Sequence, residues 1–64
     1  MCLSNVYREE VKEENLLARN IADIRVESGK IILKHLMGIR QELDATIKKV
    51  DLMENYILIS GTGL

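Results

Sequence analysis

The stretch ADIRVESGKIILK, residues 22–34, carries the strongest secondary-structure signal in this chain of 64 residues. Apolar Ala22, Ile24 and Val26 alternate with charged residues, which is the period of a strand with one face buried. Ser28-Gly29 supplies small residues, one of them tolerant of a positive φ, as a tight hairpin turn requires. The pattern therefore predicts a strand that ends in a β-hairpin.

The returning strand of this hairpin is predicted over residues 30–36. Ile31 and Leu33 fall on one face of it, and Met37-Gly38 ends it. The two strands should pair antiparallel, because a short turn leaves no room for a crossover connection.

The amino-terminal third is predicted to contain a strand, a charged connection and a turn. Residues 2–7 are rich in β-branched and aromatic side chains and form the first strand. Residues 8–14 are dominated by charge and form a solvated connection. Residues 15–18 resume an apolar run, and Arg19-Asn20 is interpreted as a turn before the strand that begins at Ile21.

The carboxyl-terminal half contains a change in strand parity. The apolar residues of 43–47 share one face, whereas Val50 and Leu52 fall on the opposite face. The strand must therefore slip by one residue near Lys48-Lys49, as a β-bulge would allow. Residues 53–55 are then predicted to form a turn.

The last strand is predicted over residues 56–60, through Ile57 and Ile59. Residues 61–64 follow as a frayed carboxyl-terminal tail. The same half also fits a helix, since its apolar residues are spaced by three or four: Ile39, Leu43, Ile47, Val50, Met53 and Ile57. These residues are mostly β-branched and no strong amino-terminal cap precedes them, which favours strands.

We therefore predict an all-β fold, a small barrel of short antiparallel strands, as a single domain over residues 1–60. Hydrophobic residues make up 47% of the chain and charged residues 30%, which is too apolar for a disordered protein. A chain this short buries only about 60% of its unfolded surface. The expected additional support is oligomerisation, and we predict a homodimer.

Charge and hydropathy exclude several classes of function. Nine Lys plus Arg against ten Asp plus Glu give a net charge of -1, which argues against a general polyanion binder. No apolar run approaches the ~20 residues of a membrane span, and no signal peptide is recognisable. We expect a cytoplasmic protein with no membrane partner. No nucleophile, base and orienting acid can be assembled from one His and one Cys, so catalysis is not expected.

Cys2 is the one residue that indicates chemistry. It is the only cysteine, and it lies beside the amino terminus. A thiolate and an adjacent amine or amide nitrogen can chelate one metal ion, and this donor set suits Ni(II), Cu or Zn. The alternative is a buried small hydrophobe, which is the commoner role of a lone cysteine. His35 is the only candidate for a second ligand, but a solvent-facing strand position explains it better.

Four segments together resemble the CooT family of small nickel-binding proteins. They are MCLSNVY (1–7), IADIRV (21–26), LMG (36–38) and IKKVDL (47–52). The resemblance covers residues 1 to about 60. Family members often carry an aromatic residue before the turn glycine and an acidic residue after it, whereas this chain has Met37 and Ile39.

The resemblance implies an SH3-like β-barrel, a homodimer and a nickel ligand at Cys2. It also implies delivery of Ni(II) to a nickel enzyme such as carbon monoxide dehydrogenase. We expect one ion between the two Cys2 residues of a dimer, since a square-planar ion takes four donors.

Two other functions stay open. An RNA-binding module, the label that many CooT members carry, would use Tyr7 and Tyr56 for stacking. Its basic residues would be Lys30, Lys34, Arg40, Lys48 and Lys49. Nucleic acid is nevertheless not expected, because this basic set is small. A protein-interaction domain without metal is the other alternative.

Overall fold

The computed structural model describes residues 3–61, which form an all-β protein with one short 3-10 helix. The elements in chain order are β1 (Ser4–Arg8), η1 (Glu13–Asn15), β2 (Leu16–Glu27), β3 (Lys30–His35), β4 (Arg40–Leu43), β5 (Thr46–Asp51) and β6 (Tyr56–Ser60). The all-β part of the predicted fold is confirmed. The alternative of a helix over residues 39–57 is wrong, because this region contains β4, β5 and the start of β6.

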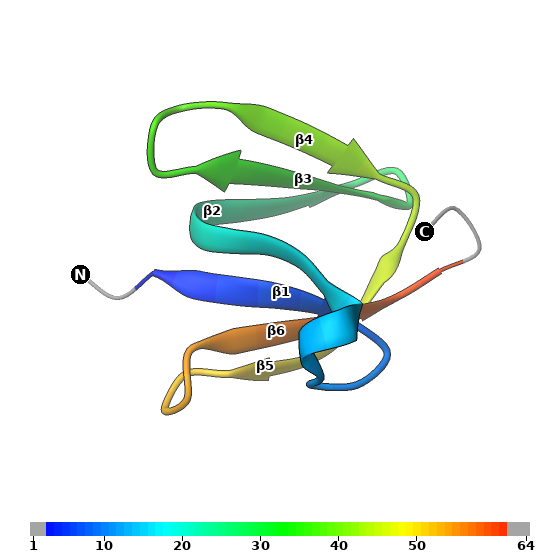
Figure 1. Cartoon of the computed structure of the whole chain (residues 1–64). Helices are drawn as coiled ribbons and strands as arrows, with labels where there is room; N and C mark the ends of the chain where they lie inside the picture. Colours follow the sequence, from blue (N-terminus) through cyan, green and yellow to red (C-terminus); the bar gives the residue numbers. More distant parts are fainter. Residues whose placement is uncertain (1–2, 62–64) are drawn as a thin grey trace.

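All six strands belong to one sheet in the order β4-β3-β2-β1-β6-β5 (Figure 1). β1 lies at the centre, antiparallel to β2 and parallel to β6. The prediction of exclusively antiparallel strands is wrong for this pair. The four strands between β1 and β6 supply the long crossover that parallel neighbours require. β4 and β5 are the edges of this order, so the pairing among residues 3–61 does not close a barrel, and the SH3-like barrel is not confirmed.

The predicted hairpin joins β2 to β3. Glu27 pairs with Lys30 across the two-residue turn. Ser28 has φ 48° and Gly29 has φ 78°. Two consecutive residues with positive φ define the turn that matches the twist of paired strands. This turn therefore requires small residues that tolerate a positive φ, as Ser28 and Gly29 do.

β2 is one continuous strand, so the turn predicted at Arg19-Asn20 is wrong. Ser4 lies opposite Ile21, and Val6 lies opposite Ala18, which leaves an extra residue in β2. Asn20 takes φ 55°, a left-handed conformation that Asn tolerates. The turn signal in the sequence thus corresponds to a β-bulge, which bends the strand without ending it.

The predicted slip in the fifth strand is confirmed. Ile47 pairs with Ile59, and Lys49 pairs with Leu58, so Lys48 is the extra residue. The turn after β5 includes Asn55 at φ 58°, as its sequence indicated. Because of this extra residue, Ile47 and Val50 can face the same side of the sheet although one is odd-numbered and the other even-numbered.

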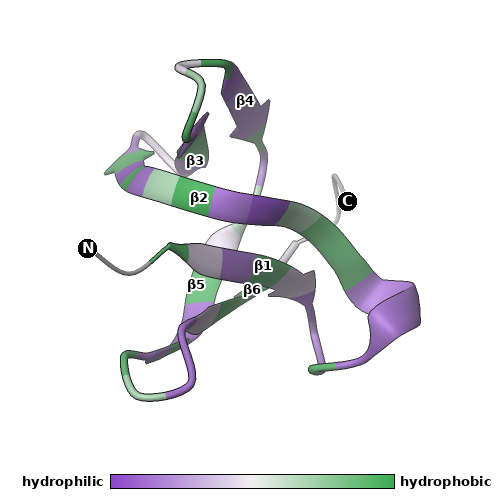
Figure 2. Cartoon of the chain, turned by 60° about the vertical axis from the view of Figure 1, so that its left-hand side comes forward, coloured by the Kyte–Doolittle hydropathy of each residue, from purple (hydrophilic) through white to green (hydrophobic). Residues whose placement is uncertain are grey.

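The core lies on the inner face of the curved sheet and is small. Its buried residues in the described chain are Val6, Ala18, Ile21, Ile31, Leu33, Ala45, Ile57 and Ile59. The burial predicted for the face of Ala22, Ile24 and Val26 is only partly observed. Ala22 is exposed, Ile24 is half-buried, and Val26 is 59% exposed although it pairs with the fully buried Ile31. Within the described chain, β2 pairs beyond Ile21 with β3 but not with β1. In Figure 2 parts of the β2 ribbon are coloured as hydrophobic.

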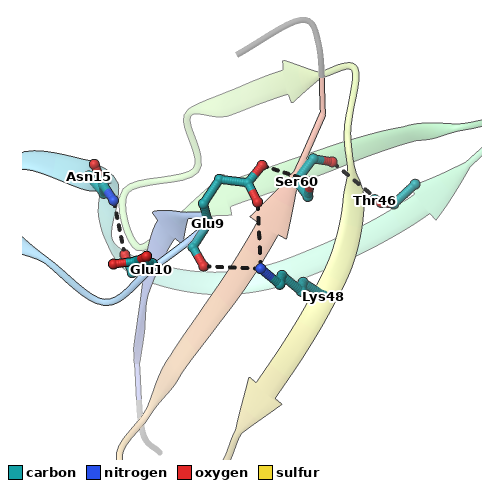
Figure 3. Close-up of polar contacts among 6 residues, drawn as sticks. All are labelled: Glu9, Glu10, Asn15, Thr46, Lys48 and Ser60. Atoms are coloured by element: carbon teal, nitrogen blue, oxygen red, sulfur yellow. Dashed lines mark hydrogen bonds and ion pairs between the residues drawn. The ribbon is translucent and has the colours of Figure 1, made fainter.

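A polar cluster fastens the far end of β1 to β5 and β6 (Figure 3). Ser60 Oγ donates to Glu9 Oε2 at 2.7 Å, and Thr46 Oγ1 donates to the Ser60 carbonyl at 3.3 Å. Lys48 Nζ lies 3.6 Å from Glu9 Oε1 and 3.5 Å from the Glu9 carbonyl. The bulge residue Lys48 therefore also anchors the chain where β1 ends.

Candidate functional site

The candidate site is the end of the sheet where β1 begins. Ser4 pairs with Ile21 in β2, and Ile21 pairs with His35 in β3. On the other side Asn5 pairs with Tyr56 in β6, which pairs with Asp51 in β5. One row of residues therefore connects the start of β1 to both halves of the sheet.

Two turns flank this row, as Figure 1 shows. Residues 36–39 connect β3 to β4 on one side, and residues 52–55 connect β5 to β6 on the other. The amide of Asn5 donates to the Asn55 carbonyl at 3.1 Å. The amide of Leu36 donates to the Asn20 carbonyl at 3.2 Å. Hydrogen bonds thus hold the turn of residues 52–55 next to β1 and the turn of residues 36–39 next to β2, the neighbour of β1.

Cys2, the predicted metal ligand, lies outside the described residues, which begin at Leu3. Within residues 3–61 no three His, Cys, Asp or Glu side chains come close enough to hold a metal ion. The described side chains therefore do not form a closed metal cage of their own.

His35 lies on the same row as Ser4, two strands away. Adjacent strands are about 4.8 Å apart, which places the two backbones about 10 Å from each other. The His35 ring is half-buried, and its Nε2 lies 3.3 Å from Gln41 Oε1. This hydrogen bond gives the imidazole a structural partner on β4. The half-buried position differs from the solvent-facing one that the sequence predicts for His35.

An apolar groove opens beside the start of β1. It has a volume of about 190 Å³ and runs between β2 and the β5–β6 hairpin. Its lining consists of Ser4, Ile21, Ala22, Asp23, Ile24, Val50, Leu52 and Ile57. Leu52 is 83% exposed. This groove is an opening of the hydrophobic core toward the surface, at the end of the molecule nearest to Cys2 in sequence.

A second hollow of about 230 Å³ lies beside the other turn. Its lining combines the apolar side chains of the turn with polar residues of β2 and β3: Arg19, Asn20, His35, Leu36, Met37 and Ile39. The sequence interpretation treated residues 36–38 only as a turn. The signal that it missed is composition, because large apolar residues replace the polar ones that surface turns usually carry.

The two tyrosines proposed for RNA stacking do lie together. The rings of Tyr7 and Tyr56 are 6.4 Å apart at 83°, and Lys49 Nζ lies 5.5 Å from the centre of the Tyr56 ring. The pKa of Lys49 is raised, chiefly through its interaction with Tyr56 and to a smaller extent through the charge of Asp51. An edge-to-face pair covered by a lysine does not present two open stacking surfaces.

The proposed basic set is also divided among different partners and elements. Lys48 contacts Glu9, Lys49 lies 4.0 Å from Asp51, and the remaining three residues lie on β3 and β4. The geometry of residues 3–61 therefore adds little support to an RNA-binding face. No helix in the described part of the chain is long and apolar enough to cross a membrane.

The described residues define a small all-β protein built on one six-stranded mixed sheet. The sequence pattern of the family described as CO dehydrogenase accessory protein CooT matches residues 1–60. The chain belongs to the CooT family.

A solved structure supports the fold. A crystal structure assigned to CooT from Carboxydothermus hydrogenoformans superimposes with a TM-score of 0.79. The two sequences are 20% identical, and the match covers 92% of this chain and 95% of the other. At this identity the likeness concerns the fold. A search of curated proteins found no match.

Proposed function

We propose that this protein is a nickel chaperone that binds Ni(II) through Cys2 and delivers it to CO dehydrogenase. The observation that carries the proposal is the family match, which extends from residue 1 to residue 60 and so includes Cys2. The family description names an accessory protein, and the protein accordingly acts without catalysing a reaction itself.

The chemistry requires two copies of the chain. One Cys2 thiolate and an adjacent backbone nitrogen supply two donors, whereas a square-planar Ni(II) ion takes four. A twofold dimer supplies the same pair of donors twice. The thiol loses its proton on binding, so the affinity for Ni(II) rises with pH. An ion held at the end of the chain is accessible for ligand exchange with a client enzyme.

The uncovered apolar residues support a dimer at this end of the sheet. Ile24, Val50 and Leu52 line the groove next to Ser4, and the last two of them are exposed. Contiguous apolar surface of this kind is typical of protein–protein interfaces. A second copy seated on the groove would bury these side chains and bring two amino-terminal segments toward one axis.

Native mass spectrometry of the nickel-titrated protein tests the proposal. We expect one Ni(II) per two chains, and no bound nickel in the variant Cys2→Ser. The variant His35→Ala serves as the control and should keep the wild-type stoichiometry. Nickel binding that survives the loss of the thiol contradicts the metal site, and one ion bound by each isolated chain contradicts the bridged dimer.

A further inference from the structure

The turn between β3 and β4 exposes three large apolar side chains. Leu36 is 59% exposed, Met37 is 85% exposed and Ile39 is 67% exposed. Single apolar residues on a surface are ordinary, but a contiguous group indicates an interaction site. Within this turn only Gly38 is not a large hydrophobic residue.

Hydrogen bonds on both sides hold the backbone of this turn in place. The amide of Gly38 donates to the His35 carbonyl at 2.9 Å, and the amide of His35 donates to the Ile39 carbonyl at 2.8 Å. The amide of Leu36 reaches the bulge of β2 at the Asn20 carbonyl. The apolar side chains are therefore presented by a preformed turn, which lowers the entropic cost of binding a partner.

Two exposed cations lie directly beside the turn. Lys34 on β3 pairs with Arg40 on β4, so two positive side chains face each other across the strands. Like charges in directly opposite positions destabilise a sheet. Lys34 also lies opposite Asp23 on β2, and that carboxylate pairs with Arg25 at 3.4 Å. The pocket that these residues line holds three cations, Arg25, Lys34 and Arg40, and two carboxylates, Asp23 and Glu27, so positive charge is in excess. In residues 3–61 neither Lys34 nor Arg40 forms a salt bridge. An anionic partner would relieve this repulsion.

We propose that residues 36–39, together with Lys34 and Arg40, form the docking surface for the client enzyme. The client would offer an apolar depression bordered by carboxylates. The inference rests on the proposed function, because transfer of an ion from Cys2 requires the client to approach the end where β1 begins. The turn lies at that end of the sheet, because it directly follows His35, which belongs to the same row of paired residues as Ser4 (Figure 1).

The opposite turn, residues 52–55, follows Asp51 and contains Glu54, and Asp51 lies 4.0 Å from Lys49 Nζ. Asp51 accepts hydrogen bonds from the amides of Met53 and Glu54, at 3.0 and 2.8 Å, so residues 51–54 combine apolar side chains with carboxylates. Glu54 has no salt-bridge partner within residues 3–61, so a client surface rich in carboxylates would meet an uncompensated negative charge there. Charge thus selects the turn of residues 36–39 and leaves the groove beside Leu52 for the second copy of the chain.

The test measures binding of the nickel-loaded protein to purified, nickel-free CO dehydrogenase from the same organism by biolayer interferometry. The apolar variant carries Leu36→Ser, Met37→Ser and Ile39→Ser together. We expect its affinity for the enzyme to fall by about tenfold or more, because truncation of central apolar contacts dominates interface energies. Nickel stoichiometry and the circular dichroism spectrum should stay unchanged, because these side chains lie outside the core.

A charge variant and a matched control complete the design. Lys34→Gln with Arg40→Gln should slow association and reduce its dependence on salt, as expected when cations steer an encounter. The control carries Val11→Ser and Lys30→Gln, both exposed and both remote from the row at Ser4, and should bind as the wild type does.

The possible outcomes separate the two proposals. An apolar variant that binds both nickel and the enzyme as tightly as the wild type overturns the docking surface and leaves the chaperone role intact. Loss of nickel binding in the wild type itself refutes the proposed function instead. If phosphatidylserine vesicles bind the wild type and not the apolar variant, or if the variant alters only the oligomeric state, the surface has another occupant and the inference is wrong.

Discussion

Replacement of Leu33 by Ala should severely destabilise this protein. Leu33 lies in the middle of β3, is 0% exposed, and pairs with Ile24 on one side and Gln41 on the other. It is one of the largest fully buried side chains of a core that contains two alanines. The substitution removes apolar contacts from the centre of the sheet and leaves space that so few neighbours cannot refill.

The magnitude follows from the atoms removed. Leu exceeds Ala by three carbons, and at about 0.8 kcal/mol each their loss costs about 2.4 kcal/mol in transfer free energy. The residual cavity adds a further cost, so we expect about 3 kcal/mol in total. A domain of this length has a free energy of unfolding of roughly 3–10 kcal/mol. The substitution therefore removes about a third or more of the total stability.

Thermal unfolding followed by circular dichroism at fixed protein concentration measures this effect. The expected decrease in Tm is roughly 12–24 °C, because each kcal/mol shifts Tm by about 4–8 °C in a domain of this size. Met37→Ala is the matched control: the side chain is of similar size, lies on the same hairpin and is 85% exposed. It should change the stability by about 0.5 kcal/mol or less. Equal shifts for the two variants would refute the assignment of the core.

Three further predictions concern backbone conformation, charge and strand register. Gly29→Ala should destabilise the protein by about 1–2 kcal/mol, because Gly29 has φ 78° and alanine adopts this left-handed conformation only at a cost. Denaturant unfolding would show the effect as a lower midpoint at an unchanged m-value. Lys12→Met should raise the pKa of Glu10 toward its ordinary value in an NMR titration, because the hydrogen bond and charge of Lys12 hold that pKa low. The ion pair of Glu10 with Lys12 stabilises the fold at pH values above the ordinary pKa of a Glu side chain, and this stabilisation is lost as the pH falls through the lowered pKa of Glu10. If the variant shows the same Glu10 titration as the wild type, Lys12 does not lower this pKa. Deletion of Lys48 should abolish cooperative unfolding, because it removes the bulge and turns residues 49–51 to the opposite faces of the sheet. The control Lys48→Ala keeps the bulge and should lower the free energy of unfolding by about 1 kcal/mol or less.

Features that depend only on neighbouring residues can be predicted from the amino-acid sequence. The alternation over residues 22–27, the turn at Ser28-Gly29 and the parity slip near Lys48 were all predictable. Each reflects local physics: the period of a strand, the φ angles of a tight turn, and the need to keep apolar side chains on one face. Cys2 was also identified from the sequence, and its role stays a prediction because it lies outside the described residues.

The signal at Arg19-Asn20 was detected but misinterpreted. Asn favours a positive φ both in turns and in bulges, and the sequence contains nothing that separates the two. The structure has a bulge at this point because β2 pairs with β1 along one edge and with β3 along the other. A continuous strand satisfies the backbone hydrogen bonds toward both neighbours.

Only the tertiary structure decided how the halves of the chain meet. The parallel pairing of β1 with β6 joins residues about 50 positions apart, and no local pattern encodes such a contact. The same pairing determines which apolar residues stay uncovered, so Val26 and Leu52 are exposed although their sequence context resembles that of core residues. It also places the turn of residues 52–55 beside the start of β1, whereas the pairing of β2 with β1 and β3 brings the turn of residues 36–39 to the same end of the sheet. Exposure and proximity are properties of the complete sheet, because each depends on which distant strand lies beside a residue.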